Sequence, residues 1–166
     1  MSAIISPCGK YRYRLERTVG MDGPVYAFFG VNPSTADASI DDATVRKWIG
    51  FVKTWGGSRF IVGNVNPFRA TDVRELASNR MTIGAMHDQM QHIDAIVHDA
   101  DILVPCWGNR SKAKHLGRDF DVVLKLLLDS GKPVMHFGLT ASGDPKHPLM
   151  LGYSTKLQPF AAKEPS

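Results

Sequence analysis

The chain has 166 residues, of which 43% are hydrophobic and 22% charged, and its formal net charge at pH 7 is +4. These totals predict one domain with its own core over residues 1–166, with residues 1–10 and 155–166 as poorly ordered tails. The charge permits an anionic partner without requiring one. Two cysteines exclude a disulfide framework and a four-cysteine metal or iron–sulfur site.

No apolar run approaches the roughly 20 residues of a membrane span, and the N-terminal segment MSAIISPCGK has no basic region before an apolar stretch. Together with the low cysteine content, this favours a cytoplasmic protein without a membrane partner. The sequence also predicts no cofactor and no particular protein partner.

The first predicted elements form a strand, a loop and a helix. Residues 11–17 (YRYRLER) alternate aromatic or aliphatic with basic side chains, which is typical of an edge strand with one solvated face. Residues 24–31 (PVYAFFGV) lack alternation and predict a strand buried on both faces. Residues 41–57 (DDATVRKWIGFVKTWGG) space their apolar side chains as a helix does, with Asp41 or Asp42 as N-cap.

The same unit then recurs along the chain. Residues 59–65, 101–107 and 132–138 predict three further strands, with helices over about residues 83–99 and within residues 111–131. Residues 139–166 contain Gly and Pro throughout and should be irregular. This alternation predicts an α/β fold, a three-layer α/β/α sandwich around a central, mostly parallel four-stranded sheet.

Four unusual clusters follow the four buried strands directly: GVNP at residues 30–33, NVNP at 64–67, WGN at 107–109, and the segment from Gly138 to His147. Ligands of open parallel sheets bind outside the carboxyl ends of the strands, so all four clusters should meet at one edge. Ordinary turn formation explains any single cluster. Their coincidence predicts a functional crevice.

A basic segment follows the third cluster at the expected start of a helix, where free N–H groups already favour an anion. It is interpreted as a phosphate-binding patch or, equally, as a solvated helix face. Three arginines of the first strand could extend the patch or protect an exposed sheet edge. The patch residues are Arg110, Lys112, Lys114 and Arg118, and the strand residues are Arg12, Arg14 and Arg17.

At these clusters the sequence resembles the uracil-DNA glycosylase superfamily, most of all its mismatch-specific thymine/uracil branch. GVNPS at residues 30–34 is similar to the motif G-I-N-P-G of that branch, and GNVNPFRAT is similar to T-N-L-V-x-R-x-T, which places Asn64, Arg69 and Thr71. CWGNRSKAK is close to W-G-x-x-A-x-K-K, and HPLML to the H-P-S-P-L loop, which places His147 and Pro148.

The resemblance implies a uracil-DNA glycosylase-like fold and a DNA partner, with a flipped base held at the sheet edge and its N-glycosidic bond hydrolysed. It implies that Asn32 positions the attacking water and that His147 donates a hydrogen bond to the departing base. Phe29, Phe68 or Trp107 would stack on the base, and Leu149 or Leu151 would fill the emptied stack. The implied base-binding set is Gly30, Val31, Pro33, Asn64, Asn66, Phe68, Trp107, Gly108 and Asn109.

The whole chain also resembles a family of small uncharacterised prokaryotic and phage proteins. That family shares G-V-N-P-S, D-D-x-T-V-R, N-x-F-x-x-R-A-T and G-x-x-x-x-G-x-P-x-H-P-L motifs, and the match covers about residues 11–151.

Other functions stay open. One is a non-catalytic module that binds nucleic acid or a nucleotide on the same fold. Another is a small-molecule enzyme that uses Asp37, Asp41 and Asp42, with or without a divalent metal, although the last two also suit a helix start. His87, Asp94 and His98 share a helical face but lack a third strong ligand nearby, so we predict no metal site. Cys106, inside an apolar strand, is interpreted as a buried small hydrophobe.

Overall fold

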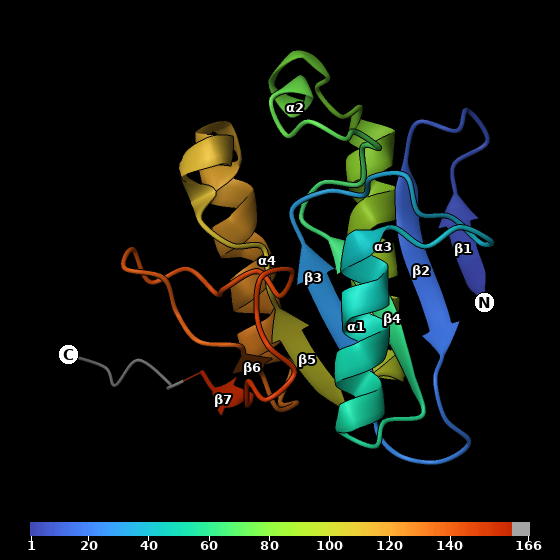
Figure 1. Cartoon of the computed structure of the whole chain (residues 1–166). Coiled ribbons are helices and arrows are strands. Elements are labelled where there is room, and N and C mark those ends of the chain that lie inside the picture. Colours follow the sequence, from blue (N-terminus) through green and yellow to red (C-terminus); the bar gives the residue numbers. More distant parts are fainter. Residues whose placement is uncertain (161–166) are drawn as a thin grey trace.

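The computed structural model describes residues 1–160, which form a mixed five-stranded sheet with helices on both faces (Figure 1). The strand order is β1-β2-β4-β3-β5. Strand β3 runs parallel to β4 and β5, whereas β2 is antiparallel to both β1 and β4. The strands are β1 (Ser2–Ile5), β2 (Arg12–Thr18), β3 (Val25–Gly30), β4 (Arg59–Asn64) and β5 (Ile102–Pro105).

The α/β class is confirmed, but the prediction of four mostly parallel strands is wrong. Residues 2–5, which we expected to be part of a tail, pair with β2 in the register Ser2↔Glu16. Strand β2 is therefore an inner strand, and the expectation of an edge strand with a solvated basic face is also wrong. Arg12 and Arg17 of β2 are also buried, so these two basic side chains must find partners inside the protein.

The fourth predicted strand, residues 132–138, barely joins the sheet. Leu103 N donates to Pro133 O at 2.9 Å, and one parallel bridge joins Leu103 to Val134. Pro133 has no N–H to offer to a sheet ladder. The chain then forms β6 (Met135–His136), which pairs with β7 (Gln158–Pro159) in a separate two-stranded sheet. The expected C-terminal tail thus includes β7, and residues 161–166 lie outside the described residues.

Helices pack on both faces because the buried strand β3 points successive side chains to opposite sides. Phe28 packs with Trp48 of α1, and Phe29 lies in the same cluster as Ile96 of α3 and Phe120 of α4. Figure 1 shows α1 in front of the sheet and α3 behind it. The helices are α1 (Ala43–Thr54), α2 (Glu75–Ser78), α3 (Ile83–Asp99), the 3₁₀ segment η1 (Arg110–Leu116) and α4 (Gly117–Asp129). Among residues 1–160, no helix is long and apolar enough to span a membrane.

The carboxyl ends of the three parallel strands bring their loops side by side. Val65 N donates to Gly30 O at 2.9 Å and Asn66 N donates to Val31 O at 2.8 Å. On the other side of β3, Cys106 N donates to Phe29 O at 2.9 Å. These bonds continue the sheet pairing beyond the strands, so the segments after β3, β4 and β5 start from fixed relative positions.

Candidate functional site

A cavity of about 410 Å³ lies at this carboxyl edge and gathers residues from five parts of the chain. Eight residues of the predicted catalytic, base-binding and phosphate-binding sets line it. They are Gly30, Val31 and Asn32 at the end of β3, Asn64 at the end of β4, Trp107 and Asn109 after β5, Lys112 of η1 and His147 of the C-terminal segment. The volume is within the range of small-molecule sites.

Asn32 is anchored through its amide nitrogen. Nδ2 donates to Ala70 O at 2.8 Å and to Pro33 O at 3.0 Å. Backbone carbonyls only accept hydrogen bonds, so this contact assigns the nitrogen and leaves Oδ1 on the other side of the amide. Among the described residues, Oδ1 accepts no hydrogen bond and is not shut off from solvent. Asn32 therefore offers a fixed acceptor at the cavity.

His147 has a defined tautomer. Its Nδ1 accepts from Leu149 N at 3.2 Å, so the neutral ring carries its hydrogen on Nε2, which is left as a donor. The ring is exposed at the cavity mouth, yet the surrounding protein atoms lower the pKa of His147, and the carboxylate of Asp42 opposes this shift. The imidazole is therefore neutral at pH 7.

The backbone at Gly108 makes room for His147. Gly108 has φ +77°, and a Cβ there would lie 3.3 Å from His147 Cβ. Gly108 N also donates to Pro145 O at 2.8 Å. The left-handed conformation and the close approach both favour glycine, and together they dock the C-terminal segment against the loop that follows β5.

Four residues of the cavity lining have a buried donor without a partner within the described residues: Arg12 Nε, Trp48 Nε1, Asn64 Nδ2 and Trp107 Nε1. Asn64 and Trp107 are each 3% exposed, and both Asn64 Nδ2 and Trp107 Nε1 make no hydrogen bond. Buried polar groups are nearly always paired in folded proteins. Glycine at position 30 leaves room for the Asn64 side chain, because a Cβ there would lie 3.0 Å from Asn64 Oδ1. The Asn64 and Trp107 donors are both suited to an acceptor supplied by a ligand.

Four residues of the predicted base-binding set, Pro33, Asn66, Phe68 and Gly108, lie outside the cavity lining. Asn66 Oδ1 accepts a hydrogen bond from Phe68 N at 2.8 Å in a turn. The Phe68 ring packs against the Tyr11 ring, with 6.0 Å between the ring centroids. The carbonyl of Pro33 is occupied by Asn32 and Ala70. Gly108 acts through the backbone instead. Of the three predicted stacking rings, only Trp107 lines the cavity, since Phe29 is fully buried in the core.

The predicted phosphate-binding patch does not gather at one place. Arg110 is paired with Asp144 at 2.9 Å and with Asp121 at 2.5 Å, and only Lys112 of this set lines the cavity. Lys114 lines a separate cavity of about 1160 Å³, next to Arg110. Arg118 is exposed and lines neither cavity. The interpretation of this segment as a single patch is therefore not supported by the geometry.

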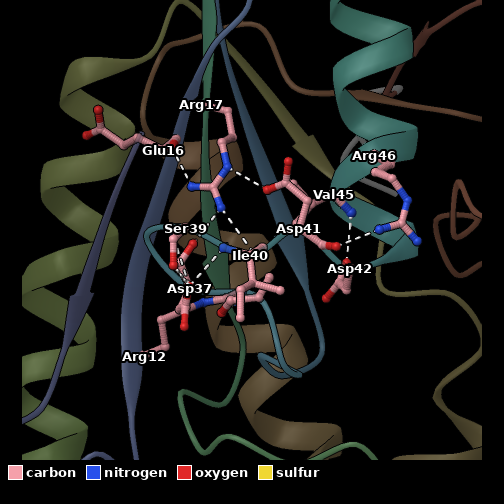
Figure 2. Close-up of polar contacts among 11 residues, drawn as sticks. Arg12, Glu16, Arg17, Asp37, Ser39, Ile40, Asp41, Asp42, Val45 and Arg46 are labelled. Atoms are coloured by element: carbon pink, nitrogen blue, oxygen red, sulfur yellow. Dashed lines mark hydrogen bonds and ion pairs between the residues drawn. The ribbon is translucent and has the colours of Figure 1, made fainter.

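The three carboxylates after β3 organise their own loop, as Figure 2 shows. Asp37 Oδ1 accepts from the backbone N–H groups of residues 39 and 40 at 2.8 and 2.9 Å. Asp41 Oδ1 accepts from Arg17 Nε at 2.7 Å, and Asp42 caps α1 by accepting from Val45 N at 2.9 Å. The helix-start alternative for Asp42 is correct. Among residues 1–160, no group of three or more His, Cys, Asp or Glu side chains could hold a metal.

Arg12 of β2 also lines the cavity, and the sequence suggested it only as a possible extension of the phosphate-binding patch. It is 3% exposed, and burial lowers the pKa of its guanidinium to about 10. The alternating pattern placed it on a solvated strand face. The missing information was the pairing of β1, which turns β2 into an inner strand.

A comparison with family models places this chain. The model described as "Protein of unknown function (DUF1643)" matches residues 12–149. The chain belongs to the DUF1643 family. This agrees with the whole-chain resemblance to an uncharacterised family. Searches of curated proteins and of solved structures gave no match.

The DUF1643 match contains the whole cavity lining, from Arg12 to His147. The match ends at Leu149. Leu149 follows His147 closely in the chain and is 41% exposed, and Met150 is 91% exposed. Leu151, the other predicted wedge residue, packs instead against the core on the α1 side of the sheet. In this DUF1643 chain, therefore, only Leu149 of the two is free to contact a partner at the cavity mouth.

Proposed function

We propose that this DUF1643 protein is glycosylase-like: it holds a nucleobase in the cavity at the carboxyl edge of the sheet and hydrolyses the N-glycosidic bond. One observation carries the proposal, namely that Asn32, Asn64 and His147 line the same cavity of about 410 Å³. The free groups of these side chains are two acceptors, Asn32 Oδ1 and Asn64 Oδ1, and two donors, Asn64 Nδ2 and His147 Nε2. That set matches what cleavage of the bond requires.

Each of these groups has a role in the proposed reaction. Asn32 Oδ1 accepts a hydrogen bond from water and orients its oxygen toward the sugar carbon C1′. As the new C1′–O bond forms, the C1′–N bond breaks and its electron pair leaves with the base, which takes up a proton in the net reaction. His147 Nε2–H and Asn64 Nδ2–H donate to the base and stabilise the negative charge that develops there. Asn32 is neutral and positions water without acting as a base.

The test is release of a base from oligonucleotides that carry uracil, mispaired thymine or a modified base. Asn32→Ala should abolish release, and His147→Ala should slow it about 10²–10³-fold, as loss of one charge-stabilising donor does elsewhere. Asn79→Ala is the matched control, because Asn79 is exposed and outside the cavity. Thermal unfolding of each variant separates lost chemistry from lost fold. If a broad panel of bases gives no release, the proposal is wrong.

A second candidate is a binding module without turnover, acting on nucleic acid or a nucleotide. The surplus of cationic and N–H donors at the cavity, including Arg12 and Lys112, favours it. Phosphate contacts would make its affinity fall steeply as salt rises. Binding that is salt-dependent in wild type, weakened in Lys112→Met and accompanied by no base release would select this candidate over the first.

A further inference from the structure

The guanidinium of Arg12 is a buried charge without a counter-ion. Among the described residues it forms no ion pair, although it is 3% exposed. One of its terminal nitrogens donates to Ala36 O at 2.6 Å, and Nε makes no hydrogen bond. A buried charge is costly unless it is paired and hydrogen-bonded. Arg12 is therefore incompletely satisfied at a point where it lines an open cavity.

Arg17, on the same strand, is a buried arginine whose charge and hydrogen-bond donors have partners inside the protein. It is 2% exposed, and it pairs with Asp41 Oδ1 at 2.7 Å and donates to three backbone carbonyls. Asp37 and Asp42 act on Arg12 only at longer range, and both are already engaged in a turn and a helix cap. The loop thus neutralises Arg17 directly and leaves Arg12 facing the cavity.

The rest of the cavity wall points to the same class of ligand. Asn64 Nδ2 and Trp107 Nε1 are buried donors without partners, and Lys112 adds a second cation. The first turn of α1 also lines the cavity and presents the positive end of a helix. The opposing acceptors are Asn32 Oδ1, Asn64 Oδ1 and the capping carboxylate of Asp42. Donors predominate, so the matching ligand is negatively charged and rich in acceptors.

We infer that the cavity binds a phosphate group of a nucleotide, with the phosphate oxygens on the Arg12 guanidinium. This inference rests on the proposed function in one respect, that the base of the same nucleotide enters the cavity. An uncharged base alone would leave Arg12 without a counter-ion, whereas a phosphate supplies the opposite charge and accepts from the terminal nitrogens of the guanidinium. The phosphate is either the monoester of a free nucleotide or a diester in a DNA strand.

The experiment compares three small probes on the intact protein at constant ionic strength: inorganic phosphate, uridine and uridine 5′-monophosphate. Phosphate and the monophosphate should raise the melting temperature saturably, and titration calorimetry should give the monophosphate at least about ten-fold tighter binding than uridine. Arg12→Met should remove this difference, and Arg12→Lys should restore part of it. Arg14→Met is the matched control, because Arg14 pairs with Glu16 and Asp99 away from the cavity lining.

The outcomes separate this inference from the proposed function. Equal affinity for uridine and its monophosphate in wild type overturns the inference, and this arm needs no variant to fold. Retention of the difference in a folded Arg12→Met protein overturns it as well. Phosphate binding without base release keeps the inference and refutes the proposed hydrolysis. Base release that does not depend on Arg12 keeps the proposed hydrolysis and refutes the inference.

A fourth probe identifies the source of the phosphate. A single-stranded oligothymidylate that displaces inorganic phosphate and binds more tightly than the monophosphate assigns the site to a DNA diester. Binding of the monophosphate without competition from the oligonucleotide assigns it to a free nucleotide. If neither compound displaces inorganic phosphate, the assignment to a nucleotide is wrong.

Discussion

The ion pair between Arg17 and Asp41 should contribute measurably to stability, and Asp41→Ala tests it. Removing one partner of a fully buried pair costs about 3–5 kcal/mol, because the other charge stays buried. Here Arg17 is 2% exposed but Asp41 is 23% exposed, so water can solvate part of the orphaned guanidinium. Arg17 also keeps its carbonyl acceptors. Asp41→Ala therefore removes essentially one charged hydrogen bond, and we expect it to lower the free energy of unfolding by about 2 kcal/mol.

Urea unfolding at pH 7 measures this loss as a lower midpoint at an unchanged slope. For a chain of this size, it corresponds to a fall in melting temperature of about 4–8 °C. Asp22→Ala is the matched control, since Asp22 is exposed, and it should change stability by less than about 0.5 kcal/mol. A double-mutant cycle with Arg17→Met isolates the pair. A coupling energy near zero would refute the assignment of Asp41 as the counter-ion of Arg17.

Three further predictions concern the thiols, pH and the cavity loop. Cys8 is exposed and the Ser6 hydroxyl lowers its pKa, whereas burial raises the pKa of Cys106 to about 12. After treatment with an alkylating reagent, mass spectrometry should therefore detect one alkylated thiol in the native protein and two in the unfolded protein. Burial lowers the pKa of His136 below 6.5, so its contribution to stability is full above about pH 6.5 and is lost as the pH falls below that value. His136→Gln should therefore flatten the decline in the free energy of unfolding between pH 7 and 5. An unchanged pH profile would contradict this. Gly108→Ala should cost about 1–2 kcal/mol in thermal unfolding, because φ is +77° there, and an unaltered melting temperature would argue against that backbone conformation.

Much of the site was predictable from the order of strands and loops. Three buried apolar runs, each followed by a Gly or Asn cluster, indicate parallel strands whose ends share an edge. Parallel pairing then places Gly30 opposite Asn64. The convergence of Asn32, Asn64 and Trp107 on one cavity follows from this local reasoning. The position of His147 at this edge was also expected, because its segment follows the fourth predicted strand; that strand barely joins the sheet, and the segment is instead docked against Gly108.

The parts that were not predicted depend on an N-terminal hairpin or on a local break in geometry. The sequence analysis treated residues 1–10 as a tail and so missed that residues 2–5 cover the outer edge of the strand that contains Arg12. The basic segment was expected at the start of a regular helix. Instead η1 is a 3₁₀ segment interrupted at Ala113, with φ −134° and ψ 46°. That break directs Lys112 and Lys114 to different cavities.

The cavity wall runs from Arg12 near one end of the chain to His147 near the other. No contiguous half of the sequence contains the donors and the acceptors together. The wall is complete only when the segment that carries His147 is docked against Gly108. A chain shortened before His147 would therefore lack part of the cavity wall, even if the rest of the chain folded.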